Sequence, residues 1–205
     1  MKKIGNMNGR EELRIKKLNN MNKIKAILFC ASLIFSFQLS NLNSAQAQVK
    51  WHTIEEAASA KIGERLYFVD FYTHWCGYCK KMDRETFTDP TVVKILNKYC
   101  YPVKFNAEGD NTFTWAGKTY RPATGNSRMR THEFARGLQG YPTFSFFNAD
   151  GTLLQSIPGF VPAADFIVIL WYIVSGDYER YPYERYRQMF DKEIRPQMKK
   201  ALSEN

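Results

Sequence analysis

A pair of cysteines, Cys76 and Cys79, most constrains what this chain can fold into, because the segments on either side of it have different periodicities. Residues 66–72 before the pair are aromatic and β-branched with a single charge, which is typical of a buried strand. Residues 80–87 after the pair are polar, with helical spacing. A strand, a short turn, two cysteines three positions apart and a helix are the setting in which such a pair carries out redox chemistry.

The remaining sequence predicts helices and strands that alternate around this motif. The length and the 44% hydrophobic fraction suit one globular domain with a substantial core. In chain order we expect a helix over residues 51–60, the strand 66–72, a helix over 76–87 interrupted at Asp89-Pro90, a helix over 91–99, a strand over 101–106, a hairpin within 113–120, a helix over 129–138, strands over 143–148 and 152–157 joined by a turn, and an apolar helix over 162–174.

The composition shifts toward tyrosine and charge after Gly176, so residues 177–205 are expected to form a C-terminal helical extension. Apolar residues recur there at spacings of three and four, which predicts one helical stripe packed on the domain. A dimer or partner surface is the alternative, and Pro196 is expected to bend or end the helix. The stripe consists of Tyr183, Tyr186, Phe190, Ile194 and Met198.

Residues 1–47 have the features of an export signal. A basic start at residues 21–25 precedes an apolar run over 26–39 that is too short to span a bilayer comfortably. The small residues of Ala45-Gln46-Ala47 fit a signal cleavage site, so we expect cleavage near Ala47 and a periplasmic or secreted protein. An uncleaved membrane anchor is the alternative, and the sequence leaves open whether Met1 or Met21 is the true start.

The positive charge is concentrated in the same segment. Of the formal net charge of +9, +6 lies within residues 1–47, which leaves +3 for the rest of the chain. That remainder is ordinary for a soluble domain. We therefore expect no nucleic-acid partner.

The cysteine count indicates a redox pair rather than a scaffold. Cys30 would leave with the signal, so the mature chain would keep Cys76, Cys79 and Cys100, too few for a disulfide framework. Cys100 is expected to be a buried apolar residue. No metal site is expected, because zinc needs about four ligands and His74 is the only further candidate nearby. Haem attachment would need a histidine directly after the pair, where this chain has a lysine.

Four motifs in order resemble thioredoxin-like proteins over about residues 50–175, most closely an exported branch that includes disulfide isomerase and reductase domains. They are Val69-Asp70-Phe71-Tyr72, Trp75-Cys76-Gly77-Tyr78-Cys79, Lys104-Phe105-Asn106 and Gly140-Tyr141-Pro142-Thr143. The resemblance implies an α/β thioredoxin fold, with a central mixed β-sheet flanked by helices and the domain over 48–176. A longer loop at about residues 110–130 and the extra C-terminal helix depart from small thioredoxins, and their roles are left open.

Cys76 is expected to be the attacking thiol and Cys79 the resolving one. A cysteine at a helix N-terminus meets unpaired N–H groups and the helix dipole, which favour a thiolate. Asp70 lies inside an apolar strand, so it should have either a raised pKa or a partner. By resemblance, Asp70 helps to deprotonate Cys79 through water, and Lys104 is its electrostatic neighbour.

The substrate-binding surface is expected from Trp75, Gly77, Tyr78, Tyr141 and Pro142. By resemblance, Pro142 follows a cis peptide bond and leaves the backbone of Tyr141 free to pair with an extended substrate. Trp75 would cover the disulfide. For His74 we favour no role.

These expectations describe an exported thiol-disulfide oxidoreductase that needs no bound cofactor. It would act on disulfides of other exported proteins and would draw electrons from a membrane donor. Disulfide isomerisation is one alternative, because Gly-Tyr also separates the cysteines of a periplasmic isomerase, although no separate dimerisation domain is visible. A non-catalytic binding module is the other. The direction of electron flow and the oligomeric state are left open by the sequence.

Overall fold

The computed structural model describes residues 17, 20–21, 47–122 and 131–204. The chain divides into two compact units, Met1–Gln46 and Ala47–Asn205, and the architecture described here is that of the second unit. The export signal expected over residues 1–47 lies almost wholly outside the described residues. Within the described part of the chain, no helix combines the length and the apolar character needed to cross a membrane.

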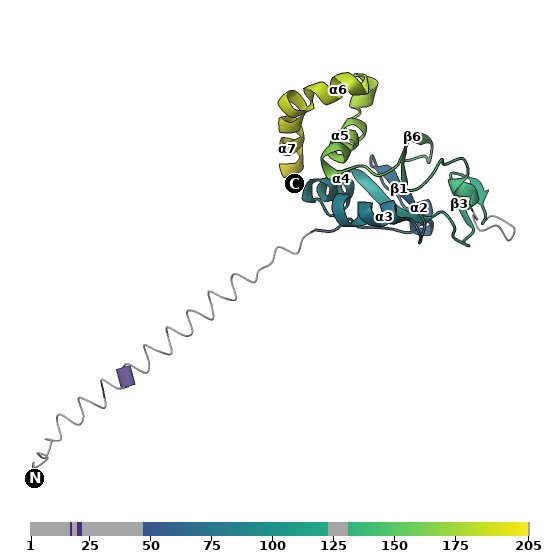
Figure 1. The fold of residues 1–205 in the computed structure, drawn as a ribbon, viewed down its shortest axis with the longest axis horizontal. Helices are drawn as coiled ribbons and strands as arrows, with labels where there is room; N and C mark the ends of the chain where they lie inside the picture. Colours follow the sequence, from purple (N-terminus) through teal and green to yellow (C-terminus); the bar gives the residue numbers. More distant parts are fainter. Residues whose placement is uncertain (1–16, 18–19, 22–46, 123–130, 205) are drawn as a thin grey trace, which may run out of the picture. The chain divides into compact units, whose positions relative to one another are not determined.

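A mixed four-stranded sheet forms the centre of the domain, in the order β2-β1-β5-β6 (Figure 1). β1 (Leu66–Tyr72) pairs in parallel with β2 (Cys100–Asn106). β5 (Thr143–Phe147) is antiparallel to both β1 and β6 (Leu153–Pro158). The sheet is mixed, and its strands lie close to the ranges predicted from the sequence, which confirms the expected thioredoxin fold.

Helices connect and cover these strands. The parallel pair β1–β2 requires a crossover, which is made by α3 (Gly77–Lys81), the π-helix η1 (Met82–Thr86) and α4 (Pro90–Tyr99). The helix expected over residues 76–87 is therefore present, with a π-helical second half. Asp89 begins α4 by accepting hydrogen bonds from the N–H groups of Thr91 and Val92, and proline fits the first helical position.

Hydrophobic cores lie on both faces of the sheet. On one face, Phe68, Phe144 and Phe146 pack with α4 and with α5 (Ala163–Val174). On the other face, Val69 and Phe71 pack with α2 (Ile54–Ser59) and with the hairpin of β3 (Phe113–Trp115) and β4 (Lys118–Tyr120). Both faces of β1 are therefore buried, as its continuous apolar sequence predicts.

The helix expected over residues 51–60 is shorter than predicted. Residues 51–53 are extended, because the His52 N–H donates to Pro102 O and His52 O accepts from the Lys104 N–H, which places this segment along the outer edge of β2. Thr53 then caps α2, with Glu56 completing a capping box.

The prediction of a helix over residues 129–138 is wrong for residues 131–138, the part that the structure describes. Residues 123–130 lie outside the described residues, and the one helical element within residues 131–138 is the 3-10 turn η2 (Glu133–Ala135). His132 caps this turn through Nδ1, and Gly137 takes a left-handed φ of 92°. Tertiary packing overrides the local pattern here, because the Phe134 ring contacts the rings of Phe71, Phe105, Phe113, Trp115, Tyr120 and Phe147.

The C-terminal extension consists of η3 (Asp177–Glu179), α6 (Tyr183–Met189), the π-helix η4 (Phe190–Ile194) and α7 (Arg195–Ser203). α6, η4 and α7 follow one another without a break, but α6 and α7 run in different directions in Figure 1, so the extension bends between them. Pro196 lies in the first turn of α7. The stripe packs on the domain as expected. Its buried members share a core with Phe166 and Leu170; they are Tyr186, Phe190, Ile194 and Met198.

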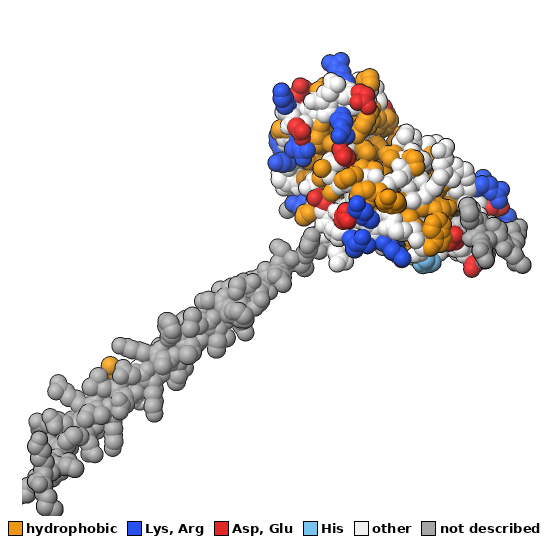
Figure 2. All heavy atoms as spheres, in the orientation of Figure 1, with side chains coloured by type: hydrophobic (Ala, Val, Ile, Leu, Met, Phe, Trp, Pro, Cys, Tyr) orange, Lys and Arg blue, Asp and Glu red, His pale blue; other side chains and the backbone are white. Residues whose placement is uncertain are grey.

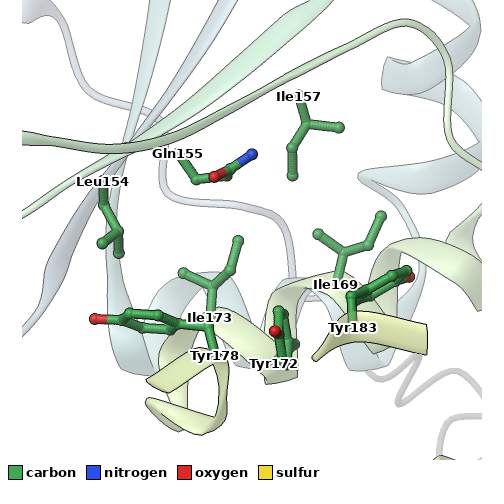
Figure 3. Close-up of a pocket in the computed structure, with 8 residues that line it drawn as sticks. All are labelled: Leu154, Gln155, Ile157, Ile169, Tyr172, Ile173, Tyr178 and Tyr183. Atoms are coloured by element: carbon green, nitrogen blue, oxygen red, sulfur yellow. The ribbon is translucent and has the colours of Figure 1, made fainter. Parts of the chain in front are cut away.

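An apolar groove of about 440 Å³ lies between β6 and the helices α5, η3 and α6. Figure 3 shows Leu154 and Ile157 of β6 facing Ile169 and Tyr172 of α5 across it. On the face shown in Figure 2, apolar side chains gather over α5 and β6. The groove contains no residue of the cysteine motif.

Candidate functional site

The two cysteines form a disulfide directly after β1, where the chain enters α3. The Cys76–Cys79 S–S distance is 2.11 Å. Cys76 is the N-cap residue of α3, and its Sγ accepts a hydrogen bond of 3.0 Å from the Cys79 N–H. A backbone donor aimed at Cys76 Sγ would stabilise a thiolate there in the reduced state. Cys79 lies inside the first turn and is 2% exposed.

An exposed aromatic rim, formed by Trp75 and Tyr78, flanks this disulfide. Trp75 and Tyr78 are 65% and 64% exposed, although large apolar side chains are usually buried. Trp75 Nε1 donates a hydrogen bond of 3.0 Å to Glu108 Oε1, which fixes the indole in place. The Tyr78 ring lies 6.3 Å from the Phe160 ring. A Cβ added at Gly77 would contact nothing within 4 Å, so the motif opens toward solvent at this position.

The loop before β5 lies beside this rim. The Tyr141–Pro142 peptide bond is cis, as the resemblance implied. The Tyr141 ring lies 6.4 Å from the Trp75 ring in an edge-to-face arrangement, which brings the loop next to the cysteine motif. Pro142 O accepts a hydrogen bond of 2.7 Å from the Gly159 N–H, and this bond ties the loop to the end of β6.

Asp70 and Lys104 face each other on neighbouring strands, as expected. They are register partners on β1 and β2, and Lys104 Nζ lies 2.6 Å from Asp70 Oδ2. Asp70 is 1% exposed, and its Oδ1 has no hydrogen-bond partner among the described residues. Burial raises the pKa of Asp70 above its ordinary value, against the opposing effect of the Lys104 ammonium. Burial alone would lower the pKa of Lys104, but the attraction of Asp70 and Asp83 outweighs it and raises that pKa.

The structure adds groups around Lys104 that the sequence did not indicate. Asp83 Oδ1 on η1 lies 2.5 Å from Lys104 Nζ. Asp83 comes one helical turn after Cys79, so the helical spacing in the sequence could have placed its carboxylate on the same side of the helix as Cys79. The rings of Trp51, Tyr72 and Phe87 lie 4.9, 5.2 and 5.3 Å from the same ammonium. Trp51 had no local signal, because its place depends on the pairing of residues 51–53 with β2.

The other titratable candidates have structural surroundings. His74 Nε2 lies 3.3 Å from Asn106 Nδ2. Cys100 is fully buried as expected, and burial raises the pKa of its thiol to about 12, so it stays a thiol at ordinary pH. Within residues 47–122 and 131–204, no group of three or more histidine, cysteine or acidic side chains is arranged to hold a metal ion.

Comparison with known proteins places this geometry among redox domains. The model of a family described as thioredoxin-like domain matches residues 54–173. The thiol:disulfide interchange protein DsbD of Salmonella typhi is 28% identical over 159 residues, which cover 71% of this chain and 25% of that protein. For the protein of the same name from Vibrio vulnificus (strain CMCP6), the identity is 27% over 115 residues, which cover 55% and 17%. The chain thus spans about a quarter of the length of the first curated relatives it matches.

Solved structures of small thioredoxin-fold proteins also match. A thioredoxin-fold protein from Helicobacter pylori has 15% identity and a TM-score of 0.47, with 72% of this chain and 91% of that chain covered. A thioredoxin from Thermus thermophilus has 23% identity and a TM-score of 0.45, with 62% and 87% covered.

Proposed function

The chain belongs to the thioredoxin-like family of thiol-disulfide oxidoreductases, and on that premise we propose that its Cys76–Cys79 pair reduces or exchanges disulfides in exported proteins. The observation that best supports this is a disulfide at the start of a helix, rimmed by the exposed rings of Trp75 and Tyr78. A purely structural disulfide would gain nothing from exposed aromatic side chains at its edge. A surface that receives other polypeptides would use them as contact area.

The proposed cycle starts from the dithiol. The Cys76 thiolate attacks one sulfur of a substrate disulfide, that S–S bond breaks, and the other substrate sulfur leaves as a thiolate that takes up a proton. Cys76 and the substrate are now joined by a mixed disulfide. Cys79 then loses its proton to the Asp70 carboxylate and attacks Cys76 Sγ. The second substrate thiolate is released, the Cys76–Cys79 disulfide forms, and the substrate has gained two electrons.

Asp70 and Lys104 are proposed to serve the second half of this cycle. A buried carboxylate whose pKa is raised by burial accepts a proton more readily than an exposed one. Lys104 keeps part of the Asp70 population ionised, because its ammonium lies 2.6 Å away. Asp70 would therefore be a base for Cys79, and Lys104 would position and stabilise it.

Substrate binding is assigned to the rim and to the cis-proline loop. We place Trp75, Gly77, Tyr78, Tyr141 and Pro142 in contact with an extended segment of the substrate. The backbone of Tyr141 would pair with that segment, as in strand addition to a sheet edge, and the aromatic rings would contact its side chains. No bound cofactor is needed, because the two sulfurs carry the electrons.

Export and electron supply complete the proposal. We propose that residues 1–47 direct the chain out of the cytosol, with cleavage near Ala47, and that a membrane-bound dithiol donor reduces the Cys76–Cys79 disulfide. The relatives named as thiol:disulfide interchange proteins support a place in disulfide electron transfer. The reduction potential of the Cys76–Cys79 pair tests the direction: a value near −270 mV supports a reductase, whereas one near −120 mV contradicts it.

The role of each sulfur is tested by trapping. In cells, full-length Cys79→Ser should accumulate mixed disulfides through Cys76, because the resolving thiol is missing. Cys76→Ser should accumulate none, and Cys100→Ser serves as the matched control that should behave like the parent chain. The proposed roles fail if Cys76→Ser traps as many partners as Cys79→Ser.

A further inference from the structure

Trp51 lies against the Lys104 ammonium of the redox site although it comes from the N-terminal segment, ahead of α2 and β1. Its ring centre is 4.9 Å from Lys104 Nζ, the shortest of the three ring distances to that ammonium. The other two rings are those of Tyr72, which ends β1, and Phe87, which follows η1. Trp51 is thus the one ring of the three that the N-terminal segment, residues 47–53, contributes.

Contacts on both sides of Trp51 hold the N-terminal segment in place. Asn97 of α4 donates from Nδ2 to Gln48 O at 2.9 Å and accepts at Oδ1 from the Lys50 N–H at 2.9 Å. The Val49 side chain is buried in the core. Backbone pairing of His52 with β2 fixes the chain directly after Trp51.

The Trp51 ring is also fixed by its aromatic neighbours. It packs edge-to-face on Phe87 with ring centres 5.1 Å apart, and it lies tilted against Phe68 at 6.1 Å. An ammonium near an aromatic ring is attracted by the ring electrons, and tryptophan gives the strongest attraction of the three aromatic types. The ring therefore adds a contact to Lys104 Nζ beyond those of the two carboxylates.

We propose that Trp51 is a positioning residue of the redox site, whose indole keeps the Lys104 ammonium seated on Asp70 and so sets how readily Asp70 takes the Cys79 proton. This inference rests on the proposed role of Asp70 as a base for Cys79. It assigns the N-terminal segment a part in the chemistry, in addition to its part in the fold.

The direction of the effect follows from the exposure of the two carboxylates. The Asp70 side chain is 1% exposed, whereas that of Asp83 is 46% exposed. Among the described residues, the charged groups that act on Asp70 are Lys104 and Asp83. Those that act on Lys104 are Asp70 and Asp83. Without the indole, water reaches the ammonium, which then moves toward Asp83 and solvent. Asp70 stays buried but loses attraction from Lys104, so its pKa rises further.

The test is a carbon-13 NMR titration of the Asp70 carboxyl group in the oxidised full-length chain. Trp51→Leu should raise the titration midpoint of Asp70 by about half to one pH unit, the range expected from losing a partly buried cation–aromatic contact. Trp51→Phe keeps a weaker ring and should give a smaller rise. If Trp51→Leu does not fold, the rise in Trp51→Phe is the test.

Val49→Ala is the matched control, because it loosens the same segment and leaves the indole in place. It should lower the melting temperature without moving the midpoint. An unchanged midpoint in both Trp51 variants overturns the inference, as does an equal shift in Val49→Ala.

Kinetics separate this inference from the proposed function. The pH profile for release of a Cys76 mixed disulfide should shift upward with the midpoint in the Trp51 variants. A moved midpoint with an unmoved kinetic profile overturns the role of Asp70 as the base, while the seating of Lys104 by Trp51 stands.

Discussion

The Lys104 ammonium lies 2.6 Å from the Asp70 carboxylate, and this ion pair is inside the protein rather than on its surface. Asp70 is almost fully buried and Lys104 is 21% exposed, so water screens the pair only weakly. A buried pair of this kind contributes little net stability compared with well-packed apolar residues. Removing Lys104 alone is costly because it leaves Asp70 buried without a cation, whereas Lys104 keeps its contact with Asp83 when Asp70 is replaced. Asp70 lies on β1, the strand that leads into the cysteine motif, and this position makes the ion pair a functional candidate.

Asp70→Asn is expected to stabilise the fold at neutral pH and to slow the release of mixed disulfides. The folded-state pKa of Asp70 is raised by burial, so the folded protein holds the proton more tightly than the unfolded chain does. The contribution of Asp70 to stability therefore falls as pH rises from the acid range through the folded-state pKa. Urea unfolding should show a gain for Asp70→Asn that is absent at acid pH and grows toward neutral pH.

The same variant tests the proposed base. Release of a Cys76 mixed disulfide should slow by about a hundredfold, at the low end of what a general base contributes. Unchanged kinetics in a folded Asp70→Asn protein would contradict the role of Asp70. A stability gain that is equal at all pH values would contradict the raised pKa.

Lys104→Met is expected to destabilise the protein by about 3–5 kcal/mol at neutral pH, because it leaves Asp70 buried without its cation. The loss should shrink as pH falls and Asp70 becomes protonated. The double variant with Asp70→Asn and Lys104→Met should recover most of the stability, since neither charge is then buried alone. Urea unfolding of the parent chain, the two single variants and the double variant gives the coupling free energy between the two residues. A coupling free energy near zero would show that they act independently.

Local signals in the sequence predicted most of what surrounds the two sulfurs. The continuous apolar run of β1 shows that both of its faces are buried, and this made Asp70 conspicuous as a single charge inside it. The cysteine spacing and the change of periodicity placed Cys76 at a helix start. The cis peptide bond before Pro142 came from family resemblance rather than from periodicity.

Non-local contacts explain what the sequence did not predict. Trp51 begins a segment with helical spacing, but pairing of His52 with β2 keeps residues 51–53 extended and directs the indole to Lys104. Phe134 falls in the helix predicted over residues 129–138, but its ring is held by aromatic side chains from strands that are far apart in the sequence. These contacts replace the predicted helix by a single turn. Single-sequence periodicity carries no information about such partners.

Cys100 is expected to be inert in the folded protein. Burial raises the pKa of its thiol to about 12, so at pH 8 almost none of it is thiolate, the form that reacts. Iodoacetamide added to the reduced native protein at pH 8 should label Cys76 within minutes and leave Cys100 unmodified, as mass spectrometry of the digested protein would show. Rapid labelling of Cys100 without denaturant would mean that the strand start at Cys100 opens.

Glu108→Ala is expected to weaken the binding of protein substrates by about fivefold, the effect of losing one hydrogen bond of about 1 kcal/mol. Glu108 fixes the exposed Trp75 indole through a 3.0 Å bond, and a loose indole must be ordered again when a substrate docks. Glu108→Gln keeps an acceptor oxygen and should behave like the parent chain. KM should rise with a protein disulfide and stay constant with a small disulfide that does not reach Trp75. A change of kcat alone would contradict this role.

The C-terminal extension is expected to be needed for stability, because its apolar side chains complete the core that α5 shares with the sheet. Phe190 is 1% exposed and packs against Tyr186, with ring centres 5.9 Å apart. Phe190→Ala should lower the free energy of unfolding by about 3–5 kcal/mol, the usual cost of emptying a buried aromatic site. Gln188→Ala, on the exposed side of α6, is the matched control and should change it by less than about 0.5 kcal/mol. Urea unfolding measures both variants, and equal stabilities would mean that the extension folds separately from the core of the domain.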